Sequence, residues 1–327
     1  MSEAVSVIVL NMNGGEMIRR CLDSIVSQDP PPDRVIVVDN GSEDGSDGLV
    51  EEHFPEAVLM RQGENTGFAA GNNAGLRKAG GDLVVLVNND CVAEAGWLAS
   101  LTRTMSDGTA GAVTSSMRNI ADLSLMDSAG GAVDWLGFSW DMGKGRPASD
   151  FPVRAEVAFP CGGAVMVRRS ALPDPDRLFD DTLFIYQEDV ELGLQLNRLG
   201  RKVVYDPGAV IRHVHSATTV RGSYFKEFLC NRNRFLILRR QFHPEVFARM
   251  RPALLGWQVL WMAASLARGR FTLYRALRNG TRDGMRMPVG WQDIGRPVED
   301  VFREFAVLRK GRPWPMFQNA SRRAMGC

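Results

Sequence analysis

The chain has 327 residues, of which 45% are hydrophobic and 24% charged, the balance of an ordinary globular protein with enough apolar material for a core. Its formal net charge of +1 at pH 7 gives no global electrostatic case for nucleic acid as a partner. Five widely spaced cysteines without a CxxC pair argue against a disulfide framework or a structural zinc site and favour a reducing compartment. We recognise no signal peptide and no apolar stretch of membrane-spanning length, so we expect a cytoplasmic protein.

Short aliphatic runs alternate with helical patterns over the first hundred residues. Strands are predicted over 5–10, 34–38, 58–60 and 83–87, and helices over 16–28, 49–54 and 97–105. The Gly-rich segment 63–75 is expected to be a loop that leads into a helix ending near Lys78. This alternation predicts an α/β fold with a parallel, doubly wound sheet flanked by helices.

Three of these strands end in polar residues. They are Asn11 and Asn13 after the first strand, Asp39 after the second, and Asn88, Asn89 and Asp90 after the most apolar one. Ligands of open α/β sheets bind outside the carboxyl ends of the strands, so we expect these side chains to meet at one crevice. Carboxylate and amide oxygens suit Mg²⁺ or Mn²⁺ carrying a diphosphate, although an Asn-Asn-Asp turn explains the triplet just as simply. Neither a P-loop nor a dinucleotide fingerprint follows the first strand.

The middle of the chain is harder to interpret. Residues 107–160 are rich in Gly, Ser and aromatic residues with few periodic segments, and we expect extended strands and a mobile loop there. The run 159–167 predicts a strand entered through Gly162 and Gly163. A glycine pair allows close approach of the backbone to a ligand, or forms a plain bulge.

Two acidic residues, Glu188 and Asp189, open a predicted helix that ends at Gly200. The helix dipole favours acids at this end, and the same positive end would keep a catalytic carboxylate ionised. Strand segments at 202–205 and 210–215 follow, separated by a Pro-Gly turn. Alternation along the second segment puts His213 and His215 on one face, as metal ligands or as ordinary exposed histidines.

Taken together, these segments resemble the family 2 glycosyltransferases of GT-A fold, most closely their rhamnosyltransferase-like branch. The similar segments follow the family's order: residues 5–13, 37–46, 64–75, 88–90, 179–189 and His213. The resemblance covers roughly residues 5 to 240 and implies a mostly parallel, twisted sheet with helices on its faces. It also implies a catalytic domain over 1–222, with a nucleotide-sugar half at about 1–105 and an acceptor half at about 106–222.

The resemblance also implies the site residues. The nucleotide-sugar donor would be held by Asn11, Asn13, Asp39, Asn65, Gly67, Phe68, Asn72, Asn88, Asn89, Gly162 and Gly163. Asp90 and His213 would hold a divalent cation, Mg²⁺ or Mn²⁺. The first position of the family's Asp-x-Asp metal motif is Asn88 here. Because an amide is a weaker ligand than a carboxylate for a hard cation, we expect weaker metal dependence than in a full Asp-x-Asp enzyme.

The implied reaction moves a sugar, rhamnose or another hexose, to a glycan or lipid-linked hydroxyl with inversion at the anomeric carbon. A hydroxyl is a poor nucleophile and needs a general base. We expect Asp189 to be that base and Glu188 to orient the acceptor or a neighbouring residue. Two alternatives remain open. A nucleotidyltransferase would need a basic phosphate loop, which the first loop lacks, and a catalytically weak nucleotide-sugar- or glycan-binding homologue would accommodate Asn88.

Residues 223–327 predict a mainly helical C-terminal extension. Its segment 252–267 is apolar apart from Gln258 and Ser265, carries Trp257 and Trp261, and has arginines on both flanks. It is too short for a comfortable membrane span. It suits a helix lying on the inner face of the cell membrane, with its tryptophans at headgroup level, or a helix packed on the catalytic domain or in a homodimer. The tail with Trp314 stays unassigned.

Overall fold

The computed structural model describes residues 3–214 and 222–307 of the chain. Its central element is a ten-stranded sheet of order β10-β12-β6-β11-β4-β1-β2-β3, with β5 paired to β12 and β7 to β6. The strands are β1 (Val5–Asn11), β2 (Arg34–Asp39), β3 (Val58–Arg61), β4 (Leu83–Asn88), β5 (Cys91–Ala93), β6 (Ala110–Asn119), β7 (Asp122–Ser128), β10 (Ala155–Glu156), β11 (Ala164–Arg168) and β12 (Lys202–His213). A separate hairpin pairs β8 (Gly131–Val133) with β9 (Ser139–Asp141).

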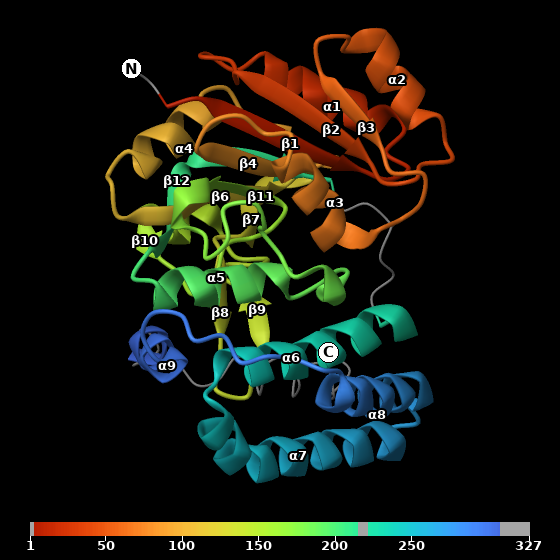
Figure 1. The fold of residues 1–327 in the computed structure, drawn as a ribbon. Coiled ribbons are helices and arrows are strands. Elements are labelled where there is room, and N and C mark those ends of the chain that lie inside the picture. The colour runs from red at the N-terminus through yellow and green to blue at the C-terminus, as the bar shows by residue number, and fades with distance from the viewer. Residues whose placement is uncertain (1–2, 215–221, 308–327) are drawn as a thin grey trace.

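Helices cover the sheet and continue beyond it. They are α1 (Glu16–Val26), α2 (Ser46–His53), α3 (Gly67–Leu76), α4 (Trp97–Met105), α5 (Glu188–Arg198), α6 (Tyr224–Gln241), α7 (Pro244–Ala267), α8 (Phe271–Arg286) and α9 (Val298–Val307). Short 3-10 turns lie at Ala148–Asp150, Arg169–Ala171 and Asp181–Leu183. Figure 1 shows α5 between the sheet and α6, with α7 and α8 on the far side of α6.

The continuous apolar runs of the first strands reflect burial on both faces of the sheet. In β4, Val85 and Val87 belong to one apolar cluster, whereas Val84 and Leu86 belong to the cluster on the other face. Strands β1 to β4 pair only in parallel among themselves, which confirms the expected fold class. Strand β11 then inserts antiparallel between β4 and β6, so the sheet is parallel on one side of β4 and mixed on the other.

Two predicted elements differ from the structure. In one, glycines predicted to form a loop lie in a helix, and in the other, a predicted Pro-Gly turn is a bulge within a strand. The segment expected as a loop up to residue 75 is already helical from Gly67, as α3. A Cβ on Gly71 would come within 2.5 Å of Leu10, and one on Gly75 within 2.5 Å of Ile8, so these glycines let the helix pack on β1. The two strand segments near 202–213 form one strand, β12, with a bulge between Asp206 and Val210.

Two further expectations changed in extent. Residues 107–160, in which no period was evident, contain the strands β6 to β10. The predicted 252–267 segment is the second part of a 24-residue helix that begins at Pro244 and contains Pro252. His215 and Trp314 lie outside the described residues.

Candidate active site

The polar residues at the ends of β1, β2 and β4 do meet. Asn11 and Asp39 face each other in the β1–β2 register, and the Asn11 side-chain amide donates to Asp39 Oδ1 over 3.0 Å. The Asn89 amide donates in turn to Asn11 Oδ1 over 2.9 Å. Asn11 is fully buried and Asp39 is 4% exposed, so this network sets the floor of the site at the carboxyl edge of the sheet.

Two exposed asparagines shape the loops around this floor. Asn13, in a left-handed conformation with φ of 51°, accepts the Glu43 backbone N–H at its Oδ1 over 2.9 Å. This contact joins the loop after β1 to the loop after β2. Asn65 Oδ1 accepts from the Asn40 amide and from the Gly67 backbone N–H, at 3.1 and 2.9 Å. The first turn of α3 is thereby set beside the end of β2.

Gly67 and Phe68, at the start of α3, lie against the segment 179–184 that precedes α5. A Cβ on Gly67 would lie 2.6 Å from the Phe184 ring and its carbonyl oxygen, so only glycine fits at this contact. The Phe68 ring lies 5.8 Å from that of Phe179. Asn72 is 1% exposed and its amide donates to the Phe68 carbonyl, so its NH₂ group stabilises the helix start.

The end of β4 comes close to the end of β12. The β5–β12 pairing sets Cys91 opposite His213, and His213 Nε2 lies 3.4 Å from Asp90 Oδ2. On the other side of the ring, His213 Nδ1 lies 3.3 Å from Asp127 Oδ2, on β7. Among the described residues, Asp90, Cys91 and His213 form a cluster of possible metal ligands, with their ligand atoms within 4.8 Å of one another.

The donor atoms at this corner fit a hard divalent cation. Burial, followed by the charge of Asp90, raises the pKa of the Cys91 thiol well above its ordinary value, and a sulfur ligand is a poor match for a hard cation. For His213 burial lowers the pKa, but the hydrogen bonds and charges of Asp127 and Asp90 outweigh burial and raise it to about 9. Asp90 and His213 would hold the ion, whose binding displaces that proton, while Asp127 orients the imidazole.

The acidic residues predicted at a helix start lie in the first turn of α5. Asp189 accepts the Gly162 backbone N–H at Oδ2 over 3.3 Å and the Val190 N–H at Oδ1 over 2.8 Å. Burial, followed by the charge of Asp141, nevertheless raises the pKa of Asp189 to about 7. Burial therefore outweighs the backbone hydrogen bonds to this carboxylate, which lower its pKa.

Glu188 differs from its neighbour in being sealed from solvent. It is 6% exposed, and its Oε2 has no hydrogen-bond partner among the described residues. Burial, followed by the charge of Asp189, raises the pKa of Glu188 well above its ordinary value. Burial thus raises the pKa of both acids, and that of Asp189 lies at about 7, which is the pKa suited to a general base.

The pair Gly162–Gly163 lies between the two sides. A Cβ on Gly162 would meet Asp189 at 3.5 Å and Phe68 at 3.6 Å, and one on Gly163 would meet the Asn88 amide at 3.3 Å. The Gly163 carbonyl also accepts the Asn88 N–H over 3.0 Å. The carboxylate and the metal corner thus flank one stretch of backbone that carries no side chain.

Sequence patterns missed two carboxylates of this site. Asp127 contacts the His213 ring, and Asp141 raises the pKa of Asp189. Both lie within 107–160, where isolated aspartates without a period or motif give no signal of a site.

The mostly parallel sheet flanked by helices is a GT-A-type fold, and the chain is a nucleotide-sugar-dependent glycosyltransferase. The family model agrees. Glycosyl transferase family 2 matches residues 6–174, just over half of the chain, and the chain belongs to this family.

Characterised relatives and solved structures support the assignment. The chain is 28% identical over 245 residues to the N-acetylglucosaminyl-diphospho-decaprenol L-rhamnosyltransferase of Mycobacterium tuberculosis H37Rv, covering 68% of this chain and 79% of that protein. It is 31% identical over 213 residues to the pre-mycofactocin glycosyltransferase of the same strain, covering 64% of this chain and 43% of that protein.

Two solved structures share the fold. The Pyrobaculum calidifontis mannosyltransferase PcManGT, in complex with GDP-Man and Mn²⁺, has a TM-score of 0.53 at 22% identity over 95% of this chain and 89% of its own. GalNAc-T7 with UDP, GalNAc and Mn²⁺ has a TM-score of 0.61 at 16% identity over 77% of this chain and 51% of its own.

The resemblance found in the sequence is therefore confirmed. The enzyme transfers a sugar from a nucleotide-sugar donor, and as a family 2 enzyme it inverts configuration at the anomeric carbon. Membership of this family excludes the nucleotidyltransferase alternative. Both solved structures that share the fold hold Mn²⁺. Among the helices of residues 3–214 and 222–307, none is long and apolar enough to cross a membrane.

Proposed function

We propose that this enzyme transfers rhamnose or another hexose from a nucleoside-diphosphate sugar to a hydroxyl group of a glycan or lipid-linked acceptor. The rhamnosyltransferase relative, similar over most of both chains, supports the choice of sugar and of a lipid-linked acceptor. The observation that carries the mechanism is Asp189, which opens α5 beside Gly162 with a pKa of about 7.

Asp189 acts as the general base. The acceptor oxygen attacks the anomeric carbon, the bond from this carbon to the diphosphate oxygen breaks, and the hydroxyl proton passes to the Asp189 carboxylate. The nucleoside diphosphate leaves on the opposite face, so the configuration inverts. Glu188, buried next to Asp189, orients the acceptor or a neighbouring residue.

The donor binds along the carboxyl edge of the sheet. We assign the base and ribose to Asp39 and the loops of Asn13 and Asn65, and the sugar-diphosphate to the Asn88–Asn89 end of β4 and the glycine pair Gly162–Gly163. The remaining donor residues, Asn11, Gly67, Phe68 and Asn72, shape these loops through the contacts described above. A cation held by Asp90 and His213 would neutralise charge on the leaving diphosphate.

The C-terminal extension supports a peripheral contact with the inner face of the membrane. The side chains of α7 that are exposed between 252 and 267 are all apolar: Pro252, Ala253, Gly256, Val259, Leu260, Ala263, Leu266 and Ala267. Leu260 is 65% and Val259 57% exposed. Exposed arginines flank this face at 249, 251, 268 and 270, where they would meet anionic headgroups.

The tryptophans of α7 do not take the position expected for them at headgroup level. Trp261 packs edge-on against Phe138, with ring centroids 5.4 Å apart, and Trp257 is only partly exposed. The aliphatic side chains, and not the indoles, would therefore enter the lipid. A second copy of the chain is the other occupant for which this face has the right chemistry.

A donor screen tests the proposal. UDP-, GDP- and dTDP-hexoses, each with and without Mn²⁺, are compared by the melting temperature of the full chain. A donor present at about one hundred times its Kd should stabilise the fold by roughly 2.7 kcal/mol. The stabilising donor is then assayed for release of nucleoside diphosphate. If no nucleotide sugar stabilises the protein or is consumed by it, the proposed function is wrong.

A further inference from the structure

The loop in front of Glu188 and Asp189 has an unusual backbone. Phe184, Tyr186 and Gln187 have φ values of 64°, 72° and 72°, although none of them is glycine. Phe184, with ψ of −67° and the Ile185 N–H bonded to the Leu183 carbonyl over 2.8 Å, forms a classic γ-turn. Residues with a Cβ avoid these conformations, which persist only where surrounding contacts hold them.

One buried amide of the C-terminal extension supplies those contacts. Asn233 on α6 is fully buried, and its Nδ2 lies 2.8, 3.1 and 2.7 Å from the carbonyl oxygens of Leu183, Ile185 and Tyr186. No regular secondary structure satisfies these three carbonyls, because the loop runs between a 3-10 turn and α5. The amide therefore replaces the hydrogen bonds that an unstrained backbone would make for itself.

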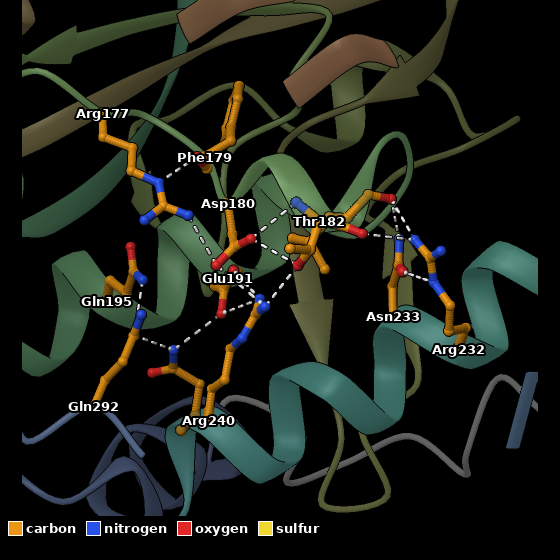
Figure 2. Close-up of polar contacts among 12 residues, drawn as sticks. Arg177, Phe179, Asp180, Thr182, Glu191, Gln195, Arg232, Asn233, Arg240 and Gln292 are labelled. Carbon is orange, nitrogen blue, oxygen red and sulfur yellow. Dashed lines mark hydrogen bonds and ion pairs between the residues drawn. The ribbon is translucent and has the colours of Figure 1, made fainter. Parts of the chain in front are cut away.

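Neighbouring groups orient that amide and complete the hold on the loop. Arg232 donates through Nε to Asn233 Oδ1 over 2.9 Å, so the Asn233 NH₂ must point at the loop. The Arg232 guanidinium also donates to the carbonyls of Thr182 and Leu183, at 2.9 Å each. Figure 2 shows both side chains reaching from α6 to the 3-10 turn that precedes this loop.

The same helix also holds the body of α5. Arg240 lies near the C-terminal end of α6 and pairs with Glu191 on α5 at 3.3 Å. It also pairs with Asp180 at 3.1 Å and donates to Thr182 Oγ1 over 2.7 Å (Figure 2). From the opposite side, the Phe184 carbonyl accepts the Ala69 N–H of α3 over 3.0 Å. The loop is thus held between α6 and the helix that follows the donor loop.

We propose that Asn233 is a positioning residue for the transfer reaction, which acts by holding the 184–187 loop so that Asp189 faces Gly162. This inference rests on the proposed role of Asp189 as the base. It gives α6 a function in the acceptor half, although α6 follows the predicted catalytic domain in sequence. A base must lie within hydrogen-bond reach of the hydroxyl, so a shift of the loop by about 1 Å would lower turnover by as much as about 10²-fold.

The chain offers a matched control two residues earlier. Asn231 lies on the same helix, is 3% exposed, and donates through its amide to the Leu277 carbonyl and Thr281 Oγ1 of α8, at 2.9 Å each. Its substitution removes a comparable number of buried hydrogen bonds but none to the 184–187 loop. Asn231→Ala and Asn233→Ala should therefore lower the melting temperature similarly while differing in turnover.

The test uses the full chain and the nucleotide sugar that stabilises the wild-type protein in the donor screen, with water as acceptor. Asn233→Ala should lower kcat for nucleoside diphosphate release about 10- to 100-fold and leave the Kd for the donor within about twofold. Asn231→Ala should keep kcat within about threefold. Arg232→Met, which removes the group that orients the amide from a half-buried position, should lower kcat in the same direction with less loss of stability.

Asp189→Asn in the same assay separates the two levels of the proposal. If Asp189→Asn turns over like wild type, the proposed base is wrong. If Asp189→Asn is inactive while Asn233→Ala and Arg232→Met retain wild-type kcat, only the positioning inference is overturned. An equal loss of kcat in Asn233→Ala and Asn231→Ala also overturns it, because the effect would then be one of general stability. Should Asn233→Ala fail to fold, the comparison of Arg232→Met with Asn231→Ala decides.

Discussion

Replacing Asp189 with asparagine should lower turnover and at the same time stabilise the protein at alkaline pH. Asparagine keeps the size of the side chain but has no basic lone pair to take the proton of the acceptor hydroxyl. We therefore expect kcat to fall about 10²–10⁴-fold with unchanged donor affinity. The gain in stability has the same origin, because ionisation of the buried Asp189 carboxyl group lowers the free energy of unfolding of the wild-type protein.

The cost follows from the pKa of Asp189, which burial and then the charge of Asp141 raise from 3.8 to about 7. Between these two values the folded protein binds more protons than the unfolded chain. Its free energy of unfolding therefore falls as pH rises through this window and stays low above it. At 1.36 kcal/mol per pKa unit, the cost is about 4 kcal/mol at pH 8 and less than half of that at pH 5.

One opposing contribution does not depend on pH. The Gly162 N–H donates to Asp189 Oδ2 over 3.3 Å, and an asparagine NH₂ at that position would face it donor to donor. The loss of this hydrogen bond costs about 1 kcal/mol. The stability of Asp189→Asn relative to wild type should therefore be about 2–3 kcal/mol higher at pH 8 than at pH 5.

Urea unfolding of both proteins at pH 5 and pH 8 measures this difference, and release of nucleoside diphosphate from the preferred donor measures kcat. A stability difference that is the same at both pH values would refute the raised pKa. Near-normal turnover of Asp189→Asn would refute its role as the base and point to Glu188 instead.

Three further predictions concern the rest of the site and the extension. Asp90→Ala and His213→Ala should each weaken Mn²⁺-dependent donor binding with little loss of fold; calorimetric titrations that find wild-type binding in both would place the cation elsewhere. Glu188→Gln should lower kcat less than Asp189→Asn, because Glu188 orients its surroundings whereas Asp189 takes the proton; a larger loss in the kinetic assay would exchange the two roles. The full chain should float with anionic liposomes, and less so at high salt, because the ions screen the arginines that flank 252–267; sedimentation as a dimer without flotation would assign this face to a second copy.

Local patterns in the sequence were enough to predict the nucleotide side of the site. Strands β1, β2 and β4 are buried on both faces, so each is a short apolar run, and each ends in a polar residue at the same edge of the sheet. Parallel pairing then brings Asn11, Asp39 and Asn89 together without information from elsewhere in the chain. The pair Glu188–Asp189 could be placed at a helix start for the same local reason.

Local patterns misled where one residue type serves two purposes. The glycines of 67–75 indicated a loop, yet Gly71 and Gly75 are the contact surface of a helix on β1. The apolar face of α7 and its arginines were evident in the sequence, but the direction of Trp261 depends on Phe138, which lies more than a hundred residues away.

The sequence by itself thus determined the fold class, the family and the residues at the strand ends, because these depend on hydrophobic period and on polar residues adjacent in the chain. Only the tertiary structure decided the raised pKa of Asp189, since this pKa depends on burial and on Asp141 from a distant hairpin. Only the tertiary structure joined Asp127 to His213, and Asn233 to the strained loop before Asp189. These contacts join residues far apart in sequence that carry no motif, and their energies depend on the exclusion of water, which no local pattern records.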